Sequence, residues 1–137
     1  FGPMGWQLHE DPDAGGGFSG APKGKETVLT VFGNAATTRP VASKLLYLPP
    51  ARYQFDAHLA NIDRGEGGFL RWQLRCVSTN GERVAWTNDS IARNTTSKLA
   101  IPPDCPIQFL DLIVSGGKGQ TGLEATISKV AISPISL

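Results

Sequence analysis

The stretch YQFDAHL, residues 53–59, alternates apolar and polar side chains without a break. A period of two residues puts successive side chains on opposite faces of an extended strand, so one face is apolar and the other polar. The run FLRWQLRCV, residues 69–77, repeats the pattern, with every second residue from Leu70 to Cys76 apolar. We predict two half-buried strands here, and we expect them to pair as a hairpin through the loop 61–68.

Strand-like runs continue on both sides of these two. Turn signals separate them, among them Asn80-Gly81 and the proline pairs at 49–50 and 102–103. Loops are expected at 34–40 and at 115–122, and long amphipathic helical runs are missing. The pattern predicts an all-β fold, an antiparallel two-sheet β-sandwich of jelly-roll type. The further strands are expected at 5–9, near Phe18, and at 28–32, 44–48, 82–87, 97–101, 107–114 and 123–132.

Length and composition restrict the range of functions. A chain of 137 residues with 40% hydrophobic and 18% charged residues is expected to form one domain, residues 1–137. The net charge is +1 and the basic residues are scattered, which argues against nucleic acid as a partner. The sequence contains neither an apolar run of about 18 residues nor a signal-peptide pattern. We expect a domain excised from a larger protein, without a membrane span.

The chain has two cysteines, Cys76 and Cys105, which lie 29 positions apart. A zinc site would need closely spaced ligand pairs, and that spacing is absent. The sequence leaves a disulfide or two buried thiols, of which we favour the disulfide. A disulfide would imply a secreted, periplasmic or cell-surface protein.

The polar faces of the two alternating runs hold the candidate ligand-binding residues. If the runs pair, their polar side chains share one sheet surface, with cross-strand neighbours about 5 Å apart. Asp111 would add a carboxylate if its strand lies beside them, and Trp86, Phe69 or Phe109 could act as an aromatic plate. The competing interpretation is a solvated face whose charges pair across strands. The candidate residues are Gln54, Asp56, His58, Arg71, Gln73, Arg75, Trp86 and Asp111.

Signals for catalysis or a metal are weak. The histidines are His9 and His58, and a G-x-S-x-G nucleophile motif is absent. An acid–base pair of Asp56 with Asp111 or Glu66 would exist only if the fold brought these distant residues together, and the sequence gives no sign of that. We therefore expect that the protein is not an enzyme. No cofactor is expected either. A structural calcium ion stays open as an alternative, with oxygen ligands from the acidic loop at Glu10, Asp11 and Asp13.

Four segments together resemble a known group of domains. They are LYLPPARYQFDAHL at 46–59, LRWQLRC at 70–76, IPPDCPIQFLDL at 101–112 and ISKVAIS at 127–133. They resemble β-sandwich modules of the carbohydrate-binding or galactose-binding-like kind. More narrowly, they are similar to C-terminal domains that follow tetratricopeptide repeats in some bacterial proteins. The resemblance implies a jelly-roll sandwich, a non-catalytic binding role and attachment to a larger parent protein.

Planar hydrogen-bonding side chains beside an aromatic plate are what sugar recognition needs. We therefore expect a carbohydrate-binding module that holds a glycan on a polar sheet face. The alternative is a protein-interaction or assembly domain without a sugar ligand, which the apolar residues near strand ends favour, such as those at 132–137.

Overall fold

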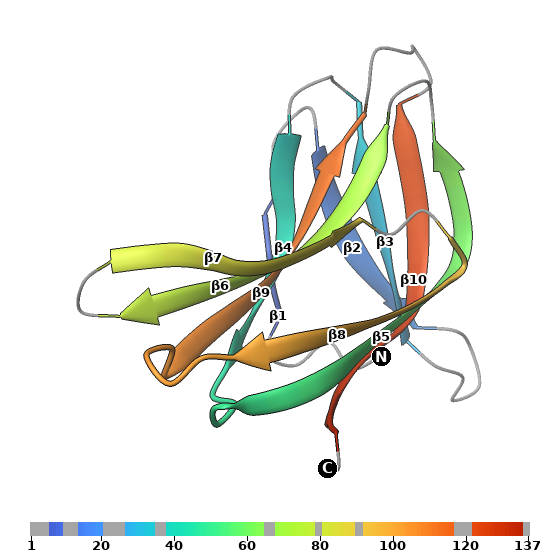
Figure 1. Ribbon diagram of the computed structural model, residues 1–137. Helices are drawn as coiled ribbons and strands as arrows, with labels where there is room; N and C mark the ends of the chain where they lie inside the picture. The colour runs from blue at the N-terminus through green and yellow to red at the C-terminus, as the bar shows by residue number, and fades with distance from the viewer. Residues whose placement is uncertain are drawn as a thin grey trace.

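The computed structural model describes residues 6–9, 14–20, 27–34, 38–64, 68–78, 81–89, 92–116 and 122–135. Ten β-strands form in these residues (Figure 1). They are β1 (Trp6–Leu8), β2 (Ala14–Gly20), β3 (Thr27–Gly33), β4 (Thr38–Leu46), β5 (Ala51–Arg64), β6 (Phe69–Ser78), β7 (Gly81–Asp89), β8 (Asn94–Ile101), β9 (Ile107–Ser115) and β10 (Leu123–Pro134).

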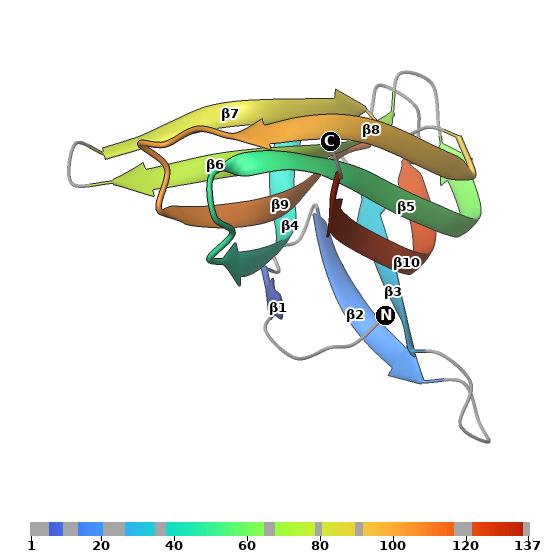
Figure 2. The same ribbon diagram turned by 60° about the horizontal axis from the view of Figure 1, so that its bottom comes forward.

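The strands form two five-stranded sheets. Sheet A has the order β1-β4-β9-β6-β7, and sheet B has the order β2-β3-β10-β5-β8. Every strand pair is antiparallel. The edge strands β7 and β8 run side by side where the two sheets meet (Figure 2). The predicted fold class, an antiparallel β-sandwich of jelly-roll type, is confirmed.

The predicted hairpin between the two alternating runs is wrong. β5 lies in sheet B between β10 and β8, whereas β6 lies in sheet A between β9 and β7. Alternation determines which side of a strand is apolar, but it carries no information about which strand lies beside it. The chain therefore changes sheets between β5 and β6, and the polar residues of the two runs lie on different faces of the molecule.

The apolar sides of the alternating runs are buried between the sheets, as predicted. In β6 every second side chain from Leu70 to Cys76 is buried. Phe55 is completely buried, with its ring centroid 5.4 Å from Trp72 and 5.0 Å from Trp86. Each large apolar side chain buried in this way stabilises the fold by about 1.5–3 kcal/mol relative to an exposed one. Other buried members of this core are Leu29, Val31, Tyr53, Leu59, Leu99, Leu110, Leu112, Val114 and Ile127.

Two strands extend into predicted loops. β4 begins at Thr38, so the end of the expected loop 34–40 is a strand, and β5 continues to Arg64, into the expected loop 61–68. Pro40 is tolerated because the pairing of β4 with β9 shifts register between Pro40 and Ala42. Proline lacks the donor that a regular ladder needs, so it favours such irregular positions. Gly81, at the predicted turn, has a φ of 111°, a conformation that suits glycine.

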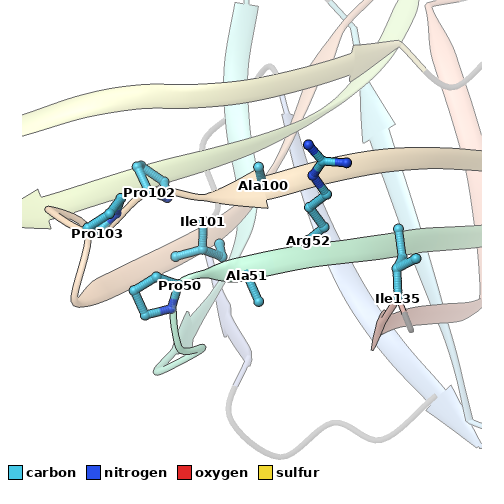
Figure 3. A pocket seen from close by; sticks show the side chains of 8 residues that line it. All are labelled: Pro50, Ala51, Arg52, Ala100, Ile101, Pro102, Pro103 and Ile135. Carbon is cyan, nitrogen blue, oxygen red and sulfur yellow. The ribbon is translucent and has the colours of Figure 1, made fainter. Parts of the chain in front are cut away.

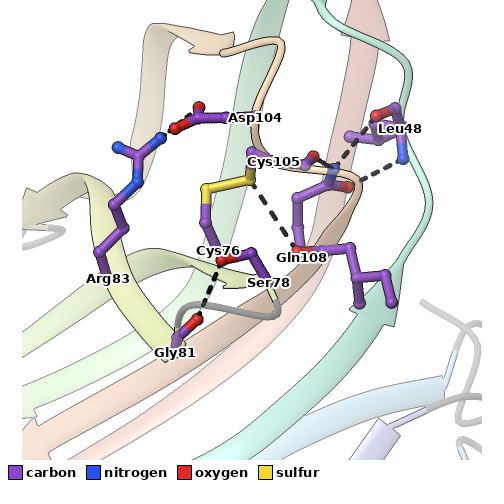
Figure 4. Close-up of a disulfide and its surroundings, with 9 residues drawn as sticks. Leu48, Cys76, Ser78, Gly81, Arg83, Asp104, Cys105 and Gln108 are labelled. Atoms are coloured by element: carbon purple, nitrogen blue, oxygen red, sulfur yellow. Dashed lines mark hydrogen bonds and ion pairs between the residues drawn. A yellow bond between two sulfur atoms is a disulfide. The ribbon is translucent and has the colours of Figure 1, made fainter.

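Cys76 and Cys105 form a disulfide, with their Cα atoms 5.3 Å apart (Figure 4). It fastens the segment between β8 and β9 to β6. The buried Gln108 ties the same segment to the end of β4: its amide nitrogen donates to the carbonyls of Cys105 (2.6 Å) and Leu48 (3.1 Å). Its amide oxygen accepts from the Leu48 N–H at 2.8 Å. An ion pair between Arg83 and Asp104 closes the outside of this corner.

Candidate functional site

A buried carboxylate organises the outer face of sheet A. Asp111 is 3% exposed, and it lies in one row with Ser43 of β4 and Gln73 of β6, because β9 pairs with both strands. The Ser43 hydroxyl donates to Asp111 Oδ1 at 2.7 Å, and the Gln73 amide donates to Oδ2 at 3.0 Å. Arg75 donates from Nε to Oδ2 at 3.0 Å and from Nη2 to Oδ1 at 3.2 Å. Two strands, β4 and β6, thus supply the donors that satisfy one carboxylate on the strand between them.

Arg75 is fixed from several sides. Its guanidinium lies over the Phe109 ring, 4.6 Å from the centroid, and Nη1 donates to Glu82 at 3.0 Å. The hydrogen bonds from its guanidinium to Asp111 raise the pKa of Arg75 above its usual value. Because the guanidinium is planar and held on both sides, its position is set before any ligand arrives.

His9 extends the polar cluster beyond Ser43. Its Nε2 lies 3.2 Å from the Ser43 hydroxyl oxygen, and its backbone N–H donates to the Val41 carbonyl at 2.9 Å. Since the Ser43 hydroxyl donates to Asp111, the His9 ring contributes the donor to Ser43 in the tautomer with a proton on Nε2. The order histidine–serine–carboxylate differs from a catalytic triad, in which the histidine lies between the other two.

A pocket of about 460 Å³ lies over this cluster. Its volume lies within the range of about 300–1,000 Å³ that is common for ligand sites. Polar groups of the cluster meet the apolar side chains of Pro40 and Ile113 in its lining. The complete lining is His9, Thr38, Pro40, Ser43, Gln73, Arg75, Asp111 and Ile113.

The structure brings together some of the predicted site residues and separates others. Gln73, Arg75 and Asp111 meet in the pocket, as expected if the strand of Asp111 lies beside 69–77. Arg71 is two residues away on the same face, over the Phe69 ring and paired with Asp89 at 2.6 Å. The sequence prediction missed His9 and Ser43 as members of this site. The only local sign of this site was Ser43 itself, a small polar residue that directly follows the apolar pair at 41–42.

Gln54, Asp56 and His58 lie on the outer face of sheet B, so the prediction that they share a surface with Arg71, Gln73 and Arg75 is wrong. Neighbours in the sheet satisfy them. The Gln54 amide donates to Asp56 at 3.0 Å, the Thr96 hydroxyl donates to Asp56 at 2.8 Å, and His58 Nδ1 lies 2.6 Å from Asn94 Oδ1. Their geometry is that of a solvated face with cross-strand pairs.

The hydrogen bonds from Gln54 and Thr96, with a smaller effect of the Lys129 charge, hold the pKa of Asp56 below its usual value. The lowered pKa means that Asp56 adds stability at pH values above its unfolded-state pKa. This contribution is lost as the pH falls through the folded-state pKa.

We expect Thr96→Val to move the pKa of Asp56 back up, as measured by NMR titration of the carboxyl carbon. An unchanged pKa in this variant would contradict the assignment, and Thr95→Val serves as the neighbouring control.

Trp86 does not belong to the outer face of sheet A. It lies opposite Leu74 in the pairing of β7 with β6 and packs on Phe55 between the sheets. The expectation that it forms a sugar plate beside Gln73 and Arg75 is therefore wrong. Phe109 and Phe69, the other two aromatics expected there, do lie on this face, below Arg75 and Arg71.

The predicted calcium ligands Glu10, Asp11 and Asp13 lie outside the described residues. Within the described part of the chain, no three His, Cys, Asp or Glu side chains come close enough together to hold a metal ion. The described residues also contain no helix that is long and apolar enough to cross a bilayer.

The fold resembles that of solved β-sandwich carbohydrate-binding modules. One solved structure similar to this chain is the CBM22-1 xylan-binding domain from Paenibacillus barcinonensis Xyn10C, with a TM-score of 0.65 and 11% identity over 98% of this chain and 88% of that one. The C-terminal family 22 module of Clostridium thermocellum Xyn10B has a TM-score of 0.58 and 18% identity over 97% and 88%. TmCBM61, solved with β-1,4-galactotriose, has a TM-score of 0.57 and 12% identity over 96% and 90%.

No protein-family model matches the sequence, and no curated protein matches it. At these identities the structural likeness establishes the fold, and the ligand has to be argued from the residues of this chain.

Proposed function

We propose that this protein is a non-catalytic carbohydrate-binding module whose pocket on the outer face of sheet A takes a glycan. The observation that carries the proposal is the buried Asp111 carboxylate, which fixes Gln73 and Arg75 at the floor of an open pocket. The glycan ligands named for the solved structures of the same fold, xylan and a β-1,4-galactotriose, support the same class of ligand.

A sugar fits the chemistry of this pocket. A pyranose offers hydroxyl groups that donate and accept, together with apolar C–H faces. The Gln73 amide keeps an oxygen free to accept after its nitrogen has donated to Asp111. Pro40 and Ile113 supply apolar contact at the side of the pocket. Because Asp111 already holds its neighbours in place, little side-chain entropy is lost on binding.

In this proposal Asp111 is a positioning residue, since its oxygens already accept four hydrogen bonds. Gln73 and Arg75 contact the sugar, with His9 at the far side of the pocket. Arg71, further along β6, extends the surface for a longer chain.

The test is a binding panel with xylan, β-1,4-galactan, mixed-linkage β-glucan and mannan, using affinity electrophoresis followed by calorimetry. We expect at least one polysaccharide to bind, and Gln73→Ala to weaken its affinity about tenfold or more, because one polar contact and a fixed donor geometry are lost. Gln54→Ala is the matched control, the same substitution on the outer face of sheet B.

Retention of wild-type affinity by Gln73→Ala would contradict the proposed site, as would an equal loss in Gln54→Ala. Absence of binding across the panel would argue against the function itself. Urea denaturation of both variants checks that a weaker affinity does not reflect unfolding.

The alternative function is a protein-interaction or assembly domain. Specific support comes from large apolar side chains on the surface, of which Tyr47 is 69% exposed and Val84 is 52% exposed.

The disulfide supports an oxidising compartment, so we propose a location outside the cytoplasm, as a secreted, periplasmic or cell-surface domain. Attachment to a larger parent protein, of the tetratricopeptide-repeat kind that the sequence resembles, is part of the same proposal.

A further inference from the structure

A second, apolar groove lies at the start of β5, on the other sheet. Its volume is about 740 Å³, and three prolines lie at one end with Ile135 at the other and Arg52 between them (Figure 3). A smaller pocket of about 280 Å³, which Trp86 and Lys98 help to line, shares Arg52, Ala100 and Ile135 with it. The main groove is lined by Pro50, Ala51, Arg52, Ala100, Ile101, Pro102, Pro103 and Ile135.

Two cations without a described ion pair lie at this groove, Arg52 in its lining and Lys98 in the lining of the smaller pocket beside it. Arg52 and Lys98 are both exposed, and neither forms a salt bridge with any residue that the structure describes. Arg52 lies opposite Ala100 and Lys98 lies opposite Gln54, so the two cations are diagonal neighbours on the β5–β8 pair, about 7 Å apart at their Cα atoms. The groove and the small pocket beside it thus combine an apolar lining with two cations that form no salt bridge with a described residue.

A surface with the opposite character lies at the far end of β5. Asp63 and Glu124 are directly opposite each other in the pairing of β5 with β10, and Phe32 lies on the other side of Glu124. Both carboxylates are exposed, and within the described chain neither has a salt-bridge partner. Like charges directly opposite each other destabilise a sheet. Asp63 and Glu124 therefore repel each other, and two cations placed against them would relieve that repulsion.

We propose that the groove of one molecule receives the Phe32–Glu124–Asp63 row of a second copy of this chain. Phe32 supplies apolar surface for the proline and isoleucine lining, and the two carboxylates meet Arg52 and Lys98. Each side thereby gains opposite charges, which no described salt bridge gives it within one molecule.

The two surfaces lie at opposite ends of one strand, so their contact is head-to-tail. A contact of this type does not use up both surfaces of either molecule, and copies add in a row. A glycan is a poorer occupant of this groove than of the Asp111 pocket, because every side chain in the lining except Arg52 is apolar.

The test measures self-association by sedimentation velocity over a range of concentrations in 50 mM and 500 mM NaCl. We expect the weight-average mass to rise with concentration at low salt and to fall back at high salt, because exposed charges are screened. The groove variant Arg52→Gln/Lys98→Gln and the row variant Asp63→Asn/Glu124→Gln are each expected to stay monomeric, with dissociation constants about tenfold higher or more.

The decisive experiment mixes the groove variant with the row variant. The first keeps an intact acidic row and the second keeps an intact groove, so the mixture is expected to form a 1:1 heterodimer and nothing larger. Lys129→Gln, which removes another exposed charge from the same sheet, is the matched control and should associate like the wild type.

A wild-type protein that stays monomeric at the highest concentration and lowest salt would overturn the proposal. Association that survives in both variants, or a mixture that stays monomeric, would overturn it as well. Failure here leaves the glycan site separately testable, because Gln73 and Arg75 lie on sheet A and none of these substitutions touches them.

Discussion

Replacement of Cys76 and Cys105 together by alanine is expected to lower the free energy of unfolding by about 3.5 kcal/mol. The disulfide closes a loop with a sequence separation of 29, and its loss frees that much chain entropy in the unfolded state. Urea denaturation of the oxidised wild type and the double variant, followed by tryptophan fluorescence, measures the difference.

A matched control is Arg83→Gln, which removes the exposed ion pair to Asp104 from the same corner and should cost well under about 1 kcal/mol. If the double variant were as stable as the wild type, Gln108 and the surrounding apolar contacts would be holding the segment between β8 and β9 by themselves.

Arg75→Met should have the next largest effect, a loss of about 3 kcal/mol in the free energy of unfolding. The Asp111 side chain is 4% exposed, and without Arg75 it keeps only the neutral donors of Ser43 and Gln73. Removing one partner of a buried ion pair leaves an uncompensated charge, which typically costs about 3–5 kcal/mol. The Arg75 side chain is 26% exposed, so we expect a value at the lower end.

Arg71→Met makes the control for this prediction. Its ion pair with Asp89 is on the same face, but the side chains are 36% and 56% exposed, so we expect a change below about 1 kcal/mol. Equal losses in the two variants would mean that burial of Asp111 does not decide the effect.

The arrangement of side chains on each strand could be predicted from the sequence. The alternation in 53–59 and 69–77 assigned the buried and exposed sides of β5 and β6, and the core positions of Phe55 and Trp72 follow from it. Local turn signals also separated the strands in the right order. These properties depend on neighbours in the sequence, which is why a local pattern reveals them.

The choice of partner strands could not be predicted in the same way. β5 pairs with β10, so that Phe55 lies opposite Ile132, across most of the chain. Nothing in the local pattern of either strand specifies that choice, which depends on how all the apolar faces close around one core. The error in the predicted hairpin therefore carried over directly to the predicted sugar surface, which combined the polar residues of 53–59 with those of 69–77.

The candidate site was partly predictable for the same reason. Gln73 and Arg75 were recognisable as outward-facing polar residues of one strand. The contribution of Asp111 depended on β9 lying beside β6, and those of Ser43 and His9 depended on β4 and the end of β1 lying beyond it. A cluster assembled from four separate segments leaves no spacing that a single sequence displays.

The strand order has a consequence for how the chain is made. β9 is the strand that joins β4 to β6 in sheet A, and β10 is the strand that joins β3 to β5 in sheet B. Both are synthesised after every strand that they connect. During translation the β1–β4 and β6–β7 pairs, and likewise the β2–β3 and β5–β8 pairs, therefore remain unjoined, with open edges that invite aggregation. The two sheets can therefore be completed only after β9 and β10 have emerged from the ribosome.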